Sequence, residues 1–105
     1  MIGSLVGTVQ FVGQKSFVLL TTGGVGYEVF PAGSLLTGVR EGVEIDCVIY
    51  TVVRETDITL YGFSSLDEKQ VFTKLLGISG VGPKIALQIV SGPVDQFLNA
   101  VAEGD

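Results

Sequence analysis

The sequence predicts an α+β protein in which all of the strands come before the helices. Three observations predict this class. Runs of β-branched and aromatic residues fill the first 63 positions, glycine-rich turns separate those runs, and the apolar spacing becomes helical from residue 64 onward. A chain of 105 residues, 47% of them apolar, suits one compact domain or two very small ones. We expect a β-barrel over residues 1–63 and a small helical domain over residues 64–105.

Five strands are expected in the first part of the chain. The turn between the second and third strands, TTGGVG, suits a hairpin because adjacent glycines accept positive φ angles. The segment PAGSLLTG, at residues 31–38, is expected to form a short helical or looped crossover before the fourth strand. This order is typical of an OB-like barrel, a fold that often binds oligonucleotides, although a fold alone does not define a function. The predicted strands occupy residues 4–12, 15–22, 25–30, 43–53 and 57–63.

Three helical patterns follow the strands. The first begins with a capping box, in which the Ser65 hydroxyl accepts from the Glu68 amide and the Glu68 side chain is expected to return a bond. This helix should end near Gly77. The second should begin at Pro83, because proline suits the first helical position, and a third pattern occupies residues 93–105. The expected apolar faces are Val71, Phe72, Leu75 and Leu76 in the first helix, and Ile85, Ala86, Ile89 and Val90 in the second.

The stretch GVGPK, at residues 80–84, connects the first two helices. Its glycines let the chain turn tightly and leave no Cβ in the way of an incoming backbone, while the first amides of the second helix point outward. Lys84 adds a mobile positive charge, and Val81 is expected to pack between the helices. The pattern predicts a phosphate-binding site made by Gly80, Val81, Gly82 and Lys84. The alternative is a glycine-rich turn that serves only close packing.

The surroundings of this turn favour the phosphate site. With LL-x-[IV]-x before it and IALQIV after it, GVGPK has the form of a helix-hairpin-helix motif, which binds a DNA phosphate independently of base sequence. The net charge of −5 is only a weak argument against nucleic acid. Six basic residues can still gather on one face, and backbone amides bind phosphate without adding formal charge.

Composition argues against an enzyme. Histidine is absent and the chain has a single cysteine, which excludes zinc fingers and the Cys-His or Ser-His-Asp nucleophile systems. Gly77 and Gly82 have the spacing of a P-loop, but Pro83 stands where the phosphate-binding lysine belongs. Cys47 lies among alternating apolar residues and is expected to be a buried, unreactive thiol. We therefore predict a non-catalytic protein without cofactor or metal.

The sequence also predicts no association with a membrane. Its apolar runs are all well short of the roughly 20 residues that a membrane-spanning helix needs. The N-terminal stretch MIGSLVGTVQ has neither a basic leader nor a cleavage-like end. We expect a cytoplasmic location.

Five stretches together carry a resemblance to a known family. They are MIG-x-L-x-G at the N-terminus, GGVGYEV, VVRE, LYGF, and GVGPKIAL-x-I-x-SG, and they extend over nearly the whole chain. In this order and at these spacings, the sequence closely resembles the RuvA family of Holliday junction branch migration proteins. The resemblance implies an OB-like domain followed by a domain with two helix-hairpin-helix motifs. It also implies homotetramers that present a basic face to four-way junction DNA, in recombination and repair, while a separate motor, RuvB, hydrolyses ATP.

The resemblance further implies segments that this sequence does not contain. Only the first helix-hairpin-helix motif is present, at residues 80–84. In the family, a second motif and a flexibly linked third domain, which contacts the motor, would follow residue 105. We expect coupling to a RuvB-type motor and full DNA affinity to depend on those segments. A fragment, a proteolysed form and a naturally short relative stay open as explanations.

The stretch RETDIT corresponds to the acidic pin of the family, a hairpin tip with two adjacent carboxylates after an arginine. Glu55 matches the first carboxylate, whereas Thr56 stands at the second position and the next acid is Asp57. In an extended tip, Asp57 would face the side opposite to Thr56. The resemblance implies that Glu55 and Asp57 repel phosphates at the crossover, with Arg54 as an additional candidate for DNA contact. Without the resemblance, the stretch RETD is interpreted as a solvated polar hairpin tip.

Two other functions stay open. A general OB-fold module that binds single-stranded nucleic acid would need stacking aromatic side chains on the barrel face. A pure interaction module would present its acidic surface to a protein partner. The candidate stacking residues, which at strand spacing more often belong to a core, are Phe11, Phe17, Tyr27, Phe30, Tyr50 and Tyr61.

Overall fold

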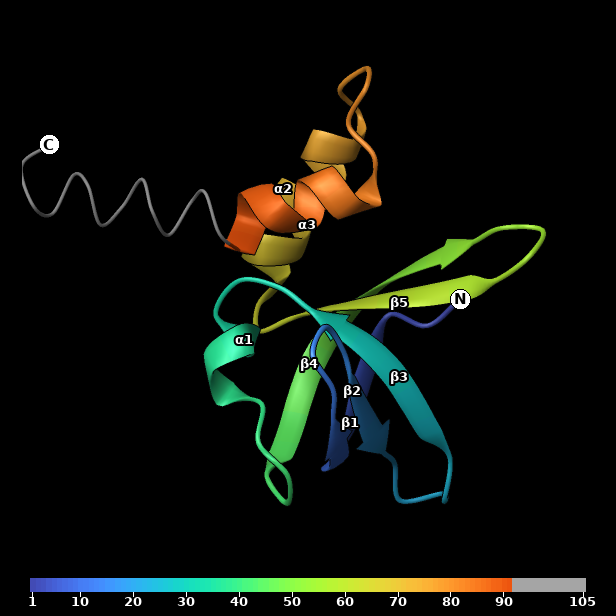
Figure 1. The fold of residues 1–105 in the computed structure, drawn as a ribbon, viewed down its shortest axis with the longest axis vertical. Helices are drawn as coiled ribbons and strands as arrows, with labels where there is room; N and C mark the ends of the chain where they lie inside the picture. Colours follow the sequence, from blue (N-terminus) through green and yellow to red (C-terminus); the bar gives the residue numbers. More distant parts are fainter. Residues whose placement is uncertain (92–105) are drawn as a thin grey trace, which may run out of the picture.

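The computed structural model describes residues 1–91, in which five strands form a closed barrel (Figure 1). Around the barrel the strands follow the order β1-β2-β3-β5-β4, and every neighbouring pair is antiparallel except β3 and β5. The predicted α+β class with an OB-like barrel is confirmed. The third helical pattern, residues 93–105, lies outside the described residues. The strands are β1 (Ser4–Val12), β2 (Phe17–Leu20), β3 (Gly26–Pro31), β4 (Glu44–Val53) and β5 (Ile58–Phe63).

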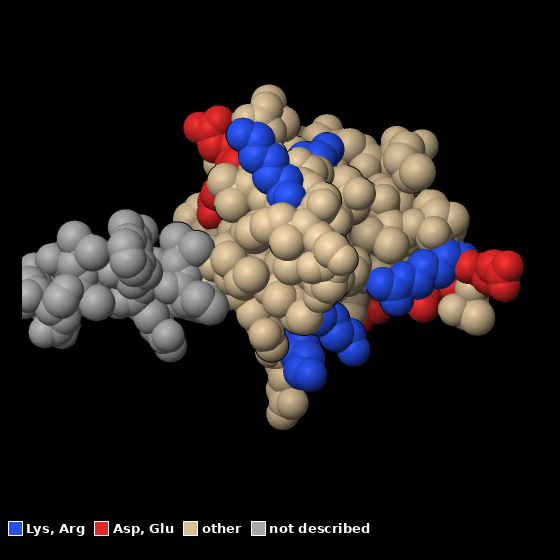
Figure 2. Space-filling view, turned by 90° about the horizontal axis from the view of Figure 1, so that it is seen from above, with Lys and Arg blue, Asp and Glu red and all other residues tan. Residues whose placement is uncertain are grey.

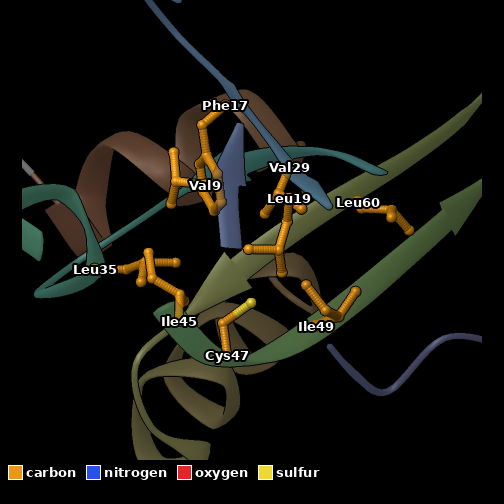
Figure 3. Packing of buried hydrophobic residues seen from close by; sticks show 9 residues of the cluster. All are labelled: Val9, Phe17, Leu19, Val29, Leu35, Ile45, Cys47, Ile49 and Leu60. Atoms are coloured by element: carbon orange, nitrogen blue, oxygen red, sulfur yellow. The ribbon is translucent and has the colours of Figure 1, made fainter. Parts of the chain in front are cut away.

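Alternating side chains of the strands fill the barrel (Figure 3). Strand β4 shows why the pattern predicts a strand: Ile45, Cys47 and Ile49 are buried, while Glu44 and Asp46 are exposed. Successive residues of a strand point to opposite faces, so a period of two separates the interior from solvent. The complete barrel core consists of Val9, Phe17, Leu19, Val29, Leu35, Ile45, Cys47, Ile49 and Leu60.

The predicted crossover forms a single helical turn, α1 (Leu35–Gly38), between β3 and β4. Leu35 closes the barrel core, and the Ala32 amide donates to the Gly62 carbonyl on β5 at 2.9 Å. Gly33 has a φ of 61°, a left-handed conformation that glycine adopts without a Cβ penalty. The crossover is therefore attached to the barrel by a hydrogen bond at Ala32 and by apolar packing at Leu35.

Two helices, α2 (Leu66–Leu76) and α3 (Pro83–Ser91), form a hairpin that packs on the barrel (Figure 1). The predicted helix start is confirmed, since the Ser65 hydroxyl accepts from the Glu68 amide at 3.3 Å. The expected return bond is wrong. The Glu68 carboxylate instead accepts from the amide and the hydroxyl of Ser34, both at 2.8 Å. The crossover brings two donors to this carboxylate, whereas the cap itself offers one.

A second apolar cluster joins the barrel to the helices. Phe72 of α2 is fully buried, and its ring lies 5.5, 5.3 and 5.1 Å from those of Tyr50, Tyr61 and Phe63. The expected apolar faces were too broad, because Val71 and Ile85 are each 47% exposed. Only a narrow side of each helix faces the barrel. The cluster consists of Ala32, Tyr61, Phe63, Phe72, Ala86 and Val90, with half-buried Phe30, Tyr50, Val52, Leu75, Leu76, Val81 and Leu87 around it.

This shared cluster bears on the two domains expected from the sequence. Its members come from the barrel and from the helical hairpin alike, so the two parts have one continuous interface. The division into residues 1–63 and 64–105 stays a prediction. None of the helices in residues 1–91 combines the length and apolar character needed to cross a membrane.

Candidate nucleic-acid interface

An open groove with a volume of about 970 Å³ runs between the barrel and the start of α3. Its walls come from the β1–β2 loop, the end of β3, α1, the β4–β5 hairpin near its tip and one side of α3 as far as Ser91. The charged residues that line it are Lys15, Arg54, Lys84 and Asp57. Three of the six basic residues of the chain thus meet one acid in this groove. The groove has a positive balance although the chain carries a net charge of −5.

The surface at the helical end of the molecule has unevenly placed charge (Figure 2). Basic side chains stand in separate groups around a largely uncharged surface, and acidic side chains lie toward the edges of this view. Such a distribution permits phosphate to approach an acidic protein, because local fields act over about 10 Å at 0.1 M salt.

The glycine turn between α2 and α3 assigns different roles to its two glycines. Gly80 has a φ of 85°, so the turn itself requires glycine there. Gly82 has no such angle, but the position of a Cβ at Gly82 is open space. Val81 is half-buried against the second apolar cluster, as expected, and its amide donates to the Ile78 carbonyl at 3.1 Å. Space is open at both glycines, but only Gly80 has a backbone conformation that favours glycine.

The start of α3 offers amides to an anion. The Ala86 amide donates to the Gly82 carbonyl at 2.9 Å, closing the first helical turn. The amides of Lys84 and Ile85 precede that bond, where an α-helix provides no acceptor of its own. Lys84 is exposed on the same turn, and the helix dipole adds about half a positive charge there. This arrangement has the chemistry of a phosphate site.

The β4–β5 hairpin projects beyond the barrel and carries the acidic tip (Figure 1). Strand pairing continues to Val53 and Ile58, and the Arg54 amide donates to the Asp57 carbonyl at 2.8 Å. The tip is therefore a tight turn centred on Glu55 and Thr56, rather than an extended strand. Strand alternation consequently does not decide which way Asp57 points.

The two acids of the tip have different surroundings. The Asp57 carboxylate lies 3.4 Å from the Thr59 hydroxyl, which donates to it, and Asp57 lines the groove together with Arg54. Glu55 is exposed at the turn and does not belong to the lining of this groove. The structure thus brings Arg54, Asp57 and Lys84 to one groove, and leaves Glu55 outside it.

Tyr61 reports the charges at the base of the hairpin. Burial is the main cause that raises the pKa of its hydroxyl, the Asp57 carboxylate raises it further, and the Arg54 guanidinium lowers it. Both charged groups are therefore close enough to act on a ring that also lines the groove.

Sequence reasoning missed Lys15 as a groove residue. It lies in the β1–β2 loop, which is closed by a 2.8 Å bond from the Gly13 amide to the Ser16 carbonyl. The Ser16 hydroxyl also donates to Glu28 at 2.6 Å, which ties this loop to β3. Lys15 carries no motif of its own, and its place in the same groove as Lys84 depends on the packing of the helical hairpin on the barrel. No local signal could have identified it.

A stacking surface for single strands receives little support from the aromatic side chains. Phe17 and Tyr61 are buried. Only Phe11, of the six candidates, is largely exposed, at 60%. The other three are half-buried against one or other apolar cluster, namely Tyr27, Phe30 and Tyr50.

Comparison with known proteins gives a consistent set of relatives. Residues 1–62 match the family model of the RuvA N-terminal domain. A Holliday junction branch migration complex subunit RuvA from Solidesulfovibrio magneticus is 41% identical to this chain over an alignment of 107 residues. The alignment covers all of this chain and 53% of the relative. A protein of the same name from Bifidobacterium adolescentis is 42% identical over 100% of this chain and 51% of its own length. Another from Oleidesulfovibrio alaskensis is 47% identical over 87% of this chain and 46% of its own length. The chain spans about half the length of these relatives.

Proposed function

Because the chain belongs to the RuvA family, we propose that it binds four-way (Holliday) junction DNA as a non-catalytic part of a branch migration complex in recombination and repair. The observation that carries this proposal is the groove, in which Lys15, Arg54 and Lys84 converge from three separate elements. Cations from different elements can follow a DNA backbone along its length. The name shared by the relatives supports the same activity.

In this proposal, a DNA arm lies along the groove and is held through its phosphates. The amides at the start of α3 and the Lys84 side chain bind one phosphate, with Gly82 leaving space for it. Lys15 and Arg54 contact the backbone farther along the groove. Phosphate contacts position the protein without reading bases, so binding is independent of sequence.

The pin acts where the arms of the junction meet. Glu55, at the exposed turn of the β4–β5 hairpin, repels phosphates at the crossover. Junction binding then needs several copies of the chain around one centre, and we propose a homotetramer. ATP hydrolysis belongs to a separate RuvB-type motor in the same complex.

Competition binding tests this proposal. Four-way junction, linear duplex and single strand of the same base composition compete for the protein at two salt concentrations, and the junction should bind best. Lys84→Ala should weaken binding to all sequences alike and lower the slope of log affinity against log salt by roughly one for each phosphate that the variant no longer binds. Lys74→Ala is the matched control, because Lys74 is an exposed lysine of α2 outside the groove.

Three results would count against the proposed function. Unchanged junction affinity for Lys84→Ala at low salt would remove the phosphate site. An equal decrease in affinity for Lys74→Ala would show that only total charge matters. A preference for single strand over junction would favour the OB-fold module that binds single strands, with Phe11 as the first residue to replace.

A further inference from the structure

Three consecutive residues of the crossover hold both helices of the hairpin. The Glu68 carboxylate, in the first turn of α2, accepts from the amide and the hydroxyl of Ser34 at 2.8 Å. The amide of Gly33 donates to the hydroxyl of Ser91, the last residue of α3, at 3.0 Å. Ala32, the preceding residue, is fully buried in the second apolar cluster. The start of α2 and the end of α3 are thus both attached to one short stretch of the crossover.

The backbone at this point is shaped for the attachment. Gly33 is buried and has a φ of 61°, and a Cβ added there would overlap the Glu68 carboxylate. Its amide would be left without a partner in the interior if the Ser91 hydroxyl were removed, which is costly for a buried donor. Glycine at position 33 therefore satisfies two requirements together, the turn and the space for Glu68.

The polar bonds supply something that the apolar cluster does not. The packing around Phe72 supplies the apolar association of the helices with the barrel, but its members in α2 lie beyond the first turn of that helix. Hydrogen bonds weaken steeply when they are misaligned, and those to a carboxylate are the stronger kind. Bonds at the start of α2 and at the end of α3 therefore restrain the direction in which the hairpin leaves the barrel.

We infer that the hydrogen bonds Glu68–Ser34 and Gly33–Ser91 together set the width of the groove between the barrel and α3, where DNA is proposed to bind. We call this pair of attachments the clasp. One wall of that groove belongs to α3 and carries Lys84, and the opposite walls belong to the barrel and carry Lys15 and Arg54. Glu68 itself does not belong to the lining of the groove. It is a positioning residue, acting through the placement of Lys84, and this role rests on the proposed function.

The test combines a distance measurement with DNA binding. Thr22→Cys in the β2–β3 turn and Gln70→Cys in α2 place two spin labels on exposed sites of the barrel and the hairpin. Cys47 is fully buried and should not react with the label. Glu68→Ala should broaden the distribution of distances between the labels while circular dichroism shows a retained fold. Without labels, the same variant should bind junction DNA roughly two- to thirtyfold more weakly, the range for substitutions that act through coupling.

Two features of the binding data distinguish positioning from direct contact. Glu68→Ala removes a negative charge, so a purely electrostatic effect would strengthen binding to DNA, opposite to the expectation. The salt slope should stay at its wild-type value, because the variant keeps every basic group and makes the same phosphate contacts once DNA is bound. Glu68→Gln should restore both the narrow distribution and the affinity, since its amide can accept from the Ser34 amide and donate to the Ser34 hydroxyl. Asp67→Asn removes the same charge from the same helical turn and should leave distances unchanged.

The outcomes separate the clasp from the proposed function. Unchanged distances in Glu68→Ala would overturn the clasp. Broadened distances with wild-type junction affinity would overturn its link to DNA binding, provided that Lys84→Ala weakens binding in the same assay. If Lys84→Ala is silent as well, the groove is not the DNA site, and the proposed function is what fails.

Discussion

Cys47 shows how burial controls the chemistry of a single residue. The thiol is fully buried in the barrel core, and burial is the main cause that raises its pKa from 9.0 to about 11. The carboxylate of Asp46 raises the pKa further, while a backbone hydrogen bond with Leu5 lowers it. The expected burial of this thiol is confirmed, and a neutral, enclosed sulfur is a poor nucleophile.

This raised pKa predicts a loss of stability at alkaline pH. Between pH 9 and 11 the unfolded chain releases the thiol proton and the folded chain keeps it, so the free energy of unfolding falls as pH rises. A shift of this size corresponds to about 2 to 3 kcal/mol once the pH exceeds the folded pKa. Urea unfolding from pH 8 to pH 11, compared with Cys47→Ala, should show this difference. Tyr61 acts in the same direction and cancels in the comparison; parallel pH curves would contradict the assignment.

At the scale of elements, the turn between α2 and α3 separates folding from binding. Gly80→Ala should cost about 1 to 2 kcal/mol of stability, because φ there is 85° and no neighbouring atom obstructs a Cβ. Gly80→Asn should cost less, since asparagine tolerates positive φ better. Gly82→Val should cost up to about 1 kcal/mol of stability, because Gly82 caps the start of α3 and valine is a poor N-cap residue. It should also weaken junction binding, because the side chain occupies the space for phosphate. Urea unfolding and binding at low salt measure the two effects. Wild-type binding by Gly82→Val would show that no backbone approaches there.

The hairpin tip predicts different behaviour for its two acids. Glu55→Gln should tighten binding to a junction and barely change binding to linear duplex, because only a junction places phosphates at the centre of an assembly. Repulsion between two unit charges 4 Å apart is about 1 kcal/mol in water, so the gain should be roughly fivefold or less. Asp57→Asn should tighten binding to junction and duplex alike, because Asp57 lines the groove beside Arg54.

Fluorescence anisotropy with both DNA substrates separates these expectations. Thr56→Val, in the same turn and without a change of charge, is the control for the shape of the tip. Weaker junction binding by Glu55→Gln would mean that Glu55 orients a basic group, and the repulsion model would then be wrong.

At the scale of the whole molecule, affinity should depend on how many copies assemble. The described residues contain one helical hairpin, α2–α3, and therefore one of the proposed phosphate sites, which by itself would support weak binding. Linking weak sites raises their effective concentration without any new contact. We expect the monomer to bind junctions poorly and an assembled form to bind them tightly. Light scattering and binding assays over the same concentration range test this. A monomer that binds junctions at nanomolar concentration in moderate salt would rule out the tetramer.

Much of this protein could be predicted from local patterns. The period of two in β4, the cap at Ser65 and the start of α3 at Pro83 depend on neighbours close in sequence, and each lies where it was expected. The turn at Gly80 was predictable for the same reason, because a positive φ is a local requirement. Local interactions act in the same way wherever the segment lies, so the sequence by itself determined the elements, their order and the phosphate site proposed at α3.

Tertiary structure decided what depends on distant partners. Glu68 bonds to Ser34 instead of its own cap, and Lys15 shares a groove with Lys84 because the helical hairpin packs on the barrel. Arg54 and Asp57 line the same groove as Lys84 because the tip of the β4–β5 hairpin and α3 meet there. Each of these positions depends on which segments come into contact after folding. The apolar cluster around Phe72 stabilises the contact between the helical hairpin and the barrel. The sequence pattern therefore determined the helices and strands, and the packing of the helical hairpin on the barrel determined how the charged side chains of the groove are spaced.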